Sequence, residues 1–343
     1  MANLAEGSSM ENTVGTATRK LGHSGIEVSA MGLGCWAIGG AWTWDGTPVG
    51  WGETDDEESI RAIRAAIDLG VSFFDTADVY GCGRSERVLG KAIAGRAEEI
   101  VVATKFGNVF DEETRNWTGE DVSPAAIRAA CQASLRRLGL DRIDLYQLHI
   151  WSLPQAQAEA VAETLEGLVA EGLIRAYGWS TDDLDCARLF APRPGCTSIQ
   201  MDLNVFKDAS ELLAICDAHD LASINRAPLA MGILSGKFGP DSKLPENDVR
   251  GQLGPEWVQF FTDGRPQPAL LEKVDALRDV LTSDGRTLVQ GALAWIWARS
   301  ERTVPIPGFK SVKQAEENAR ALEFGPLSSA QMSQVGQILD ANQ

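Results

Sequence analysis

Short apolar runs alternate along the chain with longer stretches in which apolar residues recur every three or four positions. Apolar throughout and only a few residues long, such runs are typical of parallel strands buried on both faces. Eight of them, most followed by a helical pattern, predict a (β/α)₈ barrel, an α/β fold of the TIM-barrel type. The runs are residues 30–36, 71–75, 100–104, 143–148, 174–179, 198–202, 221–226 and 302–306.

Helix start and stop signals fill the gaps between these runs. The segments 54–70, 123–139 and 153–172 each begin with a capping residue or a proline and end at a glycine or just before one. Two helical segments, 269–281 and 328–340, exceed the eight-fold alternation, and residues 19–29 predict an N-terminal β-hairpin that turns at His23–Gly25. Capping-box patterns pair Thr54 with Glu57, Ser311 with Gln314, and Ser328 with Gln331.

The alternation continues without an internal boundary, so we expect one barrel domain over residues 18–343 after a flexible tail at 1–17. A doubly wound sheet is the alternative, and this chain length would need about two of them. Two connections, 107–122 and 235–267, are long and rich in Gly, Pro and aromatic residues. Both follow predicted strands, which favours binding loops at the C-terminal face of a barrel.

Four residues with complementary chemistry cluster at predicted strand ends. Asp75, Lys105 and His149 end three successive strands, and Tyr80 follows Asp75 by five residues. Each has a structural alternative: a loop cap, a core histidine, or a ring packed over the barrel mouth. Together they fit proton donation to a carbonyl, because a lysine held charged by an aspartate lowers the pKa of a neighbouring phenol. His149 can then orient the substrate oxygen by a hydrogen bond.

The segment GVSFFDTADVYGCGRSERVLG (70–90) resembles the signature of the aldo-keto reductase superfamily, and the resemblance extends from about residue 18 to 340. Within that superfamily it is most similar in character to bacterial members and to the potassium-channel β subunits. The resemblance implies that Asp75, Tyr80, Lys105 and His149 form a catalytic tetrad. It further implies NAD(P)H-dependent reduction of an aldehyde or ketone, with Tyr80 as the general acid.

The same resemblance implies a coenzyme site, with NADP(H) preferred and NAD(H) possible. Three positions depart from the family pattern: Thr181 replaces an asparagine, Arg226 an aromatic residue, and Gln314 an arginine, which leaves Lys310 to recognise the 2′-phosphate. A helix start at Ser311 would offer free N–H groups to that phosphate. The implied coenzyme contacts are Cys35, Trp36, Asp75, Ser180, Gln200, Arg226, Ala227, Pro228, Leu229, Gly232, Ser235, Lys237, Gly308, Phe309, Lys310, Gln314, Glu317 and Asn318.

GLGCWA (32–37) fits a dinucleotide-binding pattern, but the Gly- and Trp-rich residues after it exclude the helix that such a motif must open. Aromatic residues crowd the predicted barrel mouth, which suits a flat or apolar carbonyl compound, or the apolar face of a sugar. They are Trp36, Trp42, Trp44, Trp51, Phe106, Trp117, Trp151 and Trp257. The predicted substrate contacts are Trp36, Tyr80, Phe106, His149 and Trp151.

The composition of the chain limits the classes of molecule that it can bind. The formal net charge is −17, which argues against nucleic acid and against anionic membranes, and any anionic ligand must be held by a few local cations. Six cysteines without paired spacing predict buried thiols in a reducing compartment. Neither a signal peptide nor a membrane-spanning apolar run is evident, and three widely separated histidines offer no metal cluster. We therefore expect a cytoplasmic protein without a metal.

Three functions fit these patterns. The first is an NADPH-dependent reductase of aldehydes or ketones. The second is an NAD(P)-dependent sugar or alcohol dehydrogenase that works in the oxidative direction. The third is a coenzyme-bound regulatory subunit with little turnover. The sequence does not decide the oligomeric state.

Overall fold

Eight parallel strands form the centre of the molecule, in a computed structural model that describes residues 17–251, 253–255 and 257–341. The sheet closes on itself, because the backbone N–H groups of Gly32 and Gly34 donate to Pro305 O and Pro307 O at 3.0 Å each. The predicted (β/α)₈ barrel is confirmed, and the doubly wound alternative is wrong. In neighbour order, the strands are β3 (Leu33–Gly34), β6 (Phe73–Asp75), β7 (Val101–Phe106), β10 (Ile143–Leu148), β11 (Ile174–Ser180), β12 (Cys196–Asp202), β13 (Ala222–Arg226) and β16 (Thr303–Pro305).

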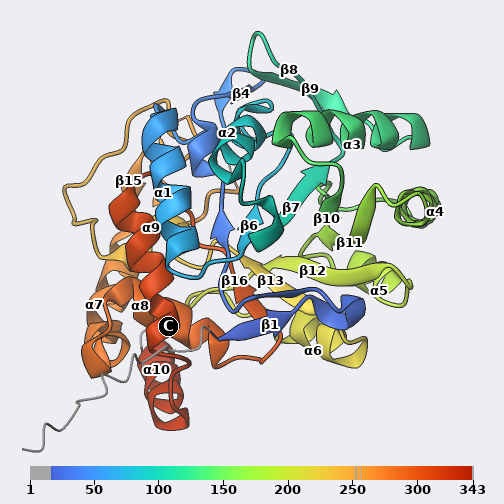
Figure 1. Cartoon of the computed structure of the whole chain (residues 1–343). Helices are drawn as coiled ribbons and strands as arrows, with labels where there is room; N and C mark the ends of the chain where they lie inside the picture. Colours follow the sequence, from blue (N-terminus) through green and yellow to red (C-terminus); the bar gives the residue numbers. More distant parts are fainter. Residues whose placement is uncertain (1–16, 252, 256, 342–343) are drawn as a thin grey trace, which may run out of the picture.

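Helices surround this barrel (Figure 1). The eight that follow the strands are α1 (Asp56–Asp68), α2 (Arg84–Ile93), α3 (Pro124–Leu138), α4 (Gln155–Ala170), α5 (Leu184–Phe190), α6 (Ser210–Ala218), α8 (Leu288–Trp297) and α9 (Val312–Ala319). The two expected additions are α7 (Pro268–Leu281) and α10 (Ser329–Ala341), which pack against each other. In the described part of the chain, no helix combines the length and apolar character that crossing a membrane requires.

One predicted helix cap is wrong by one residue. Asp55, not Thr54, caps α1, and its carboxylate accepts from the backbone N–H of Glu57 at 2.9 Å. The Thr54 hydroxyl instead accepts from Arg84 at 2.8 Å, a contact across 30 residues that the local pattern does not contain. The predicted tail lies, apart from Ala17, outside the described residues, and the single-domain boundary stays a prediction.

The predicted N-terminal hairpin packs across one end of the barrel. Strands β1 (Thr18–Lys20) and β2 (Glu27–Ser29) pair antiparallel, and Leu21, Ile26 and Val28 between and along them are buried. They join an apolar cluster with inward-facing residues of the barrel strands, such as Leu145 and Ile224. Figure 1 shows β1 at the end of the molecule opposite the β8–β9 hairpin. The N-terminal segment therefore fills one end of the barrel and leaves the other for chemistry.

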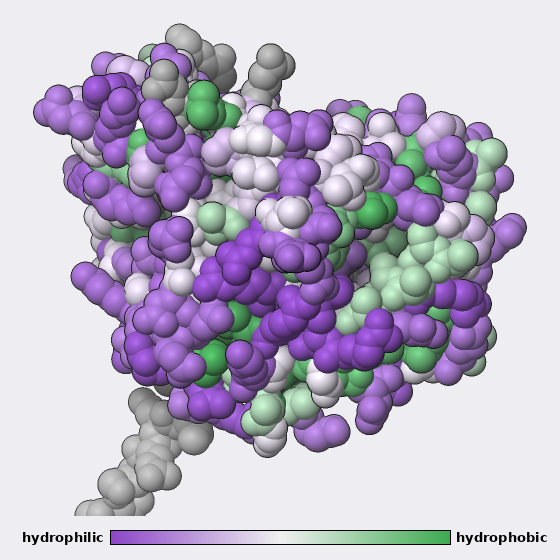
Figure 2. Space-filling view, turned by 90° about the horizontal axis from the view of Figure 1, so that it is seen from above, coloured by the Kyte–Doolittle hydropathy of each residue, from purple (hydrophilic) through white to green (hydrophobic). Residues whose placement is uncertain are grey.

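The connections at the opposite end form a small sheet of their own. Strands β8 (Asn108–Asp111) and β9 (Asn116–Glu120) form a hairpin in the predicted 107–122 loop, and β4 (Thr43–Trp44) and β5 (Thr47–Pro48) extend it to four strands. The longer loop contains the short pair β14 (Phe261–Thr262) and β15 (Arg265–Pro266). Seen from above, the molecule carries hydrophilic residues over most of its surface, with hydrophobic ones in small groups (Figure 2).

The GLGCWA segment does not open an α-helix. Its strand, β3, is followed only by the short 3₁₀ turn η2 (Ala37–Gly39), and the next α-helix begins at Asp56. The rejection of a dinucleotide-binding motif of the strand–turn–helix kind is therefore confirmed, although a three-residue turn does form where we expected no helix at all.

Replacing Leu21 by alanine tests the role of the hairpin as a plug. Leu21 is fully buried within the barrel, so Leu21→Ala should lower the free energy of unfolding by about 2–5 kcal/mol. The matched control is Leu253→Ala on the long loop, where the side chain is 58% exposed and the change should stay within about 0.5 kcal/mol. Urea unfolding of both variants measures the difference; equal midpoints would contradict the plug.

Candidate active site

A buried ion pair lies where β6 and β7 end. Lys105 and Asp75 are 0% and 2% exposed, and the ammonium of Lys105 donates to a carboxylate oxygen of Asp75. It also donates to the carbonyl of Thr76 at 2.8 Å and to the hydroxyl of Tyr80 at 3.3 Å. Three of the four residues predicted to act together thus form one hydrogen-bonded group.

Two glutamines, on strands that β11 separates in the sheet, hold the other oxygen of Asp75. The side-chain amides of Gln147 in β10 and Gln200 in β12 donate to Asp75 Oδ2 at 2.9 and 2.8 Å. Ser180 in turn donates to Gln200 at 3.3 Å. Gln147 was not among the predicted site residues. Its signal in the sequence is a polar side chain within an apolar strand, two residues before His149.

Tyr80 is seated by a close approach of two backbones. Gly81 has a φ of +61°, and a Cβ there would lie 2.1 Å from the carbonyl oxygen of Gly39. Only glycine fits, because a side chain would push apart the turn after β3 and the loop that carries Tyr80. The Tyr80 ring stacks on Trp36 at 6.0 Å and meets the His149 ring edge-on at 5.6 Å. All four predicted residues therefore come together.

Burial sets the protonation states of these groups. It raises the pKa of Tyr80 above 10.0, and the nearby Lys105 ammonium offsets only part of that rise. We expected Lys105 to lower this pKa; its effect has that sign, but desolvation of the enclosed phenol is larger. Burial, followed by repulsion from Lys105 and Arg226, holds the pKa of His149 well below 6.5, so its ring is neutral at pH 7. Burial alone would lower the pKa of Lys105, yet Asp75 and Tyr80 raise it.

The predicted aromatic residues divide into separate groups. Trp36 and Trp51 both lie in the connection between β3 and α1, called here the first loop, and their rings meet edge-on at 5.2 Å. Trp36 also lies 5.9 Å from Trp257 of the long loop (235–267), so these contacts join the two loops beside Tyr80. Trp44 and Trp117 pair at 4.9 Å on the small sheet.

Phe106 is a correction. Its side chain is fully buried and stacks on Tyr146 at 4.5 Å, so it belongs to the core and does not line an open pocket. Phe106 lies at the last position of β7, where side-chain alternation, which the apolar pattern alone does not resolve, turns it away from the Lys105 side.

A network of four charged residues borders the site at the ends of β11, β12 and β13. Arg226 pairs with Asp182 at 2.7 Å, and Lys207 bridges Asp182 and Asp202 at 2.9 and 3.0 Å. The Arg226 guanidinium lies 5.7 Å from the ring of Trp151, which is 59% exposed. The two positive and two negative side chains of this network cancel. This wall of the site therefore has no net charge, and the ring of Trp151 is its exposed feature.

Thr181, the first departure from the family pattern, has a local role. Its hydroxyl donates to the carbonyl of Trp151 at 2.6 Å and accepts from the backbone N–H of Asp183 at 3.0 Å. Both its donor and an acceptor position are thus used to fix the loop that carries Trp151.

The segment after β13, predicted to hold the coenzyme, has strained backbone. Ala227, Ala230 and Met231 have φ values of 49°, 47° and 52°, a region that costs non-glycine residues about 1–3 kcal/mol each. Gly232 follows at φ 98°, and the Ser235 hydroxyl donates to its carbonyl at 2.6 Å. Successive N–H groups in such turns form concavities that bind anions. The N–H groups of Ala230 and Gly232 already donate to Ala227 O and Leu229 O, so a phosphate here would be held by other N–H groups of the turn, with Lys237 beside it.

The segment after β16 supplies a second cation. Burial, and repulsion from Arg250, lower the pKa of Lys310 despite Asp248 nearby, and its ammonium donates to the carbonyl of Trp51 at 2.8 Å. Gly308 is exposed and has open space above it, which also suits a close approach by a ligand. Lys237 likewise has a pKa lowered by burial and by Arg250. Both ammonium groups are partly buried near the cation of Arg250, so a bound anion would stabilise their charged forms.

Other predicted coenzyme contacts are limited by their own bonds. At the start of α9, Glu58 already accepts from Val312 N and Ser311 from Gln314 N, so the helix offers fewer free N–H groups than expected. Phe309 is buried in the core, and Asn318 is buried and donates to Gly308 O at 3.3 Å. These two can shape the segment, but both residues are almost completely buried. Cys35 is also fully buried.

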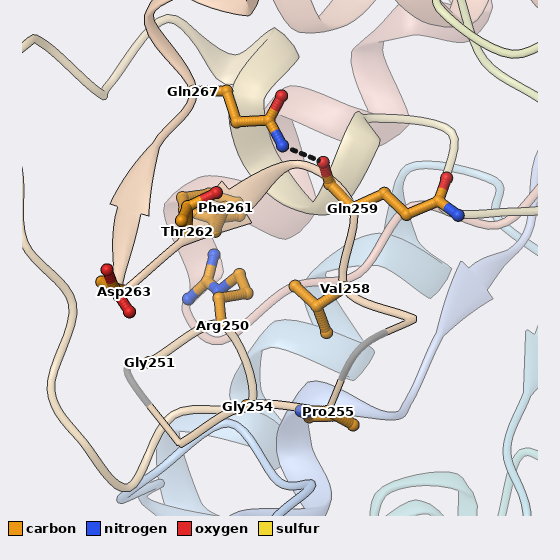
Figure 3. A pocket seen from close by; sticks show the side chains of 10 residues that line it. All are labelled: Arg250, Gly251, Gly254, Pro255, Val258, Gln259, Phe261, Thr262, Asp263 and Gln267. Atoms are coloured by element: carbon orange, nitrogen blue, oxygen red, sulfur yellow. Dashed lines mark hydrogen bonds between the residues drawn. The ribbon is translucent and has the colours of Figure 1, made fainter.

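A cavity of about 400 Å³ opens in the long loop, and Tyr80 is not among the residues that line it (Figure 3). The guanidinium of Arg250 forms one wall, and the side-chain amide of Gln267 donates to Gln259 O at 2.6 Å at another. The full lining is Arg250, Gly251, Gly254, Pro255, Val258, Gln259, Phe261, Thr262, Asp263 and Gln267.

Comparison with known proteins agrees with this geometry. The chain is 34% identical to a chloroplastic pyridoxal reductase of Arabidopsis thaliana, over 87% of this chain and 80% of the relative. It is similar in structure to a glycerol dehydrogenase of Gluconobacter oxydans, with 28% identity, a TM-score of 0.80 and 96% of both chains covered. An aldo/keto reductase of Klebsiella pneumoniae, solved with NADP and acetate, matches with 27% identity and a TM-score of 0.67, over 94% of each chain.

Residues 30–340 match the Aldo/keto reductase family, a range that contains every strand of the barrel and all four clustered residues. The family resemblance and the fold predicted from the sequence are thereby both confirmed. The chain is an NAD(P)H-dependent oxidoreductase and belongs to the aldo/keto reductase family.

Proposed function

We propose that the protein reduces an aldehyde or ketone with NADPH, and that Tyr80 is the general acid. The observation that carries this proposal is the contact of the Tyr80 hydroxyl with the buried Lys105 ammonium at 3.3 Å, beside the ring of His149. When bound, NADPH supplies the hydride. The solved relative that contains NADP supports this coenzyme.

Each residue of the group has a separate task in this proposal. Tyr80 donates its proton to the carbonyl oxygen of the substrate as the alcohol forms. Lys105 stabilises the negative charge left on the phenol, and Asp75 keeps the lysine charged in a buried site. His149, neutral at pH 7, offers a ring N–H to the same substrate oxygen, which holds the carbonyl in place.

Lys237 and Lys310 are the cations proposed to hold the coenzyme phosphates, and the strained backbone after β13 comes just before Lys237 in the chain. The overall charge of −17 repels an anionic coenzyme at long range, so these two lysines must bind its phosphates by close contact. The charge-balanced aromatic wall of Trp151 and Arg226 favours an uncharged substrate with a flat or apolar part. The six buried free thiols support a reducing compartment, the cytoplasm.

The oxidative direction is a second candidate, because a solved structure similar to this one is a glycerol dehydrogenase. The same residues would serve, with Tyr80 as the base that accepts the alcohol proton. The pH dependence distinguishes the two uses of Tyr80.

Removal of the Tyr80 hydroxyl tests the general acid. Tyr80→Phe should lower kcat for reduction by about a hundredfold or more while the Kd for NADPH stays within about threefold. Tyr146→Phe is the matched control: its buried hydroxyl has no hydrogen-bond partner among the described residues, and kcat should change by less than about twofold. Steady-state kinetics with a panel of aldehydes and ketones, pyridoxal included, gives the comparison. Near-normal turnover in Tyr80→Phe would refute the assignment.

The pH profile follows from the directions of the pKa shifts. The pKa of Tyr80 is raised above 10.0, so the phenol keeps its proton throughout the neutral range and kcat for reduction should be level from about pH 6.5 to 9. Because the pKa of His149 is lowered, no step should occur near pH 6.5. Oxidation needs the phenolate and should rise with pH across the same range. A fall in reduction centred near pH 6.5 would show that His149 titrates there.

Coenzyme preference tests Lys310. Lys310→Met should raise the Kd for NADPH by about tenfold to a hundredfold, the value of one charge-assisted hydrogen bond, and leave the Kd for NADH within about twofold. Lys313→Met removes an exposed lysine from the same segment and should change neither. Fluorescence titration with both coenzymes measures the ratio, and an equal loss for the two would exclude 2′-phosphate recognition by Lys310.

A further inference from the structure

Arg250 is a buried arginine in the long loop to which no role has yet been assigned. Its side chain is 6% exposed, and it pairs with Asp248 through two parallel bonds of 2.8 and 2.7 Å. A third bond runs from its guanidinium to the carbonyl of Met231 at 2.9 Å. Arg250 is therefore bound on both sides, and the long loop is fixed to the segment after β13.

Arg250 contacts the strained part of the segment proposed to hold a coenzyme phosphate. We call this segment, residues 227–237, the phosphate cradle. Met231 lies in the left-handed region at φ 52°, between Ala230 and Gly232, which also have positive φ. Such a conformation persists only where surrounding contacts determine it. The Met231 carbonyl accepts a hydrogen bond from a charged donor, which is stronger than a neutral one. Arg250 thus stabilises a turn whose backbone conformation is unfavourable for Ala230 and Met231.

The same guanidinium contacts the first loop. It lies 4.2 Å from the centre of the Trp51 ring, and the backbone of Val249 donates to Gly50 O at 2.7 Å. Lys310 donates to the carbonyl of Trp51, so the segment after β16 meets the same point. Three segments from distant parts of the sequence are fastened together around one side chain.

Arg250 is not itself placed to serve as the phosphate ligand. Asp248 neutralises its charge through a paired contact, whereas neither Lys237 nor Lys310 forms an ion pair with a carboxylate in the described part of the chain. Lys237 and Lys310 therefore supply the positive charge that can attract a phosphate. Arg250 instead fixes the position of the backbone around it. An arginine suits this task because its planar fork can hold a carboxylate, a carbonyl and an aromatic face at once.

We propose that Arg250 is a positioning residue for coenzyme binding: it holds the backbone at Met231 and the ring of Trp51 together, so that the cradle exists before the coenzyme arrives. This inference rests on the proposed NADPH-dependent function. It also links the cradle to the catalytic phenol, because the ring contacts run from Arg250 to Trp51, from Trp51 to Trp36 at 5.2 Å, and from Trp36 to Tyr80 at 6.0 Å.

The test compares Arg250→Met with Arg250→Lys and with the control Arg265→Met, an exposed arginine of the same loop. If the formed cradle falls to about a tenth of the population without Arg250, the Kd for NADPH rises about tenfold. We expect this rise in Arg250→Met, little recovery in Arg250→Lys because lysine lacks the fork, and no change in the control. The KM for the carbonyl substrate should change by less than about threefold.

A double substitution separates positioning from general loss of stability. Trp51→Leu should itself weaken NADPH binding, and combining it with Arg250→Met should add little, because both changes release the same packed unit. Two independent effects that multiply would overturn the proposal. So would an Arg250→Met protein that binds NADPH within twofold of the unchanged protein.

The outcome also separates this inference from the proposed function. If the unchanged protein binds no NADPH by fluorescence titration, the proposed function fails, and the inference fails with it. If the unchanged protein binds NADPH and Arg250→Met binds equally well, the proposed function stands and Arg250 is a structural residue only. Should Arg250→Met fold poorly, Trp51→Leu and Arg250→Lys still report on the same contact.

Discussion

The site depends on keeping a charged lysine inside the barrel. Lys105 is fully buried, and an isolated ammonium there would lose its proton or destabilise the fold. Asp75 supplies the opposite charge, Thr76 a carbonyl, and Gln147 and Gln200 occupy the second oxygen of the aspartate. With nearly every polar atom of the pair satisfied, the remaining direction of the ammonium is toward Tyr80.

The barrel makes that arrangement possible by separating two layers. One end is filled by apolar side chains, to which the N-terminal hairpin contributes, and these form a rigid floor. At the other end the strands finish in polar side chains that meet because parallel strands all point the same way. The floor excludes water from below, which strengthens the electrostatic contacts above it.

A strongly acidic protein that binds an anionic coenzyme must concentrate its positive charge. Lys237 and Arg250 lie in the long loop and Lys310 in the segment after β16, and all three have Asp248 as an acidic neighbour. The division of work among them is physical: paired charge fixes shape, and unpaired charge attracts phosphate. The same division holds at Arg226, whose pairing with Asp182 leaves Trp151 as the accessible feature of that wall.

The sequence alone was sufficient for the barrel, the order and approximate positions of its strands, and the four clustered residues, because each rests on a local pattern: apolar runs, caps, and polar residues at strand ends. It could not find Gln147, Arg250 or the burial of Phe106. Whether a side chain faces a charge depends on contacts such as Gln200 with Asp75, 125 residues apart, and on strand alternation in three dimensions. The sign of the Tyr80 pKa shift was missed for the same reason: local charge is visible in sequence, but desolvation exists only once the chain has closed around the phenol.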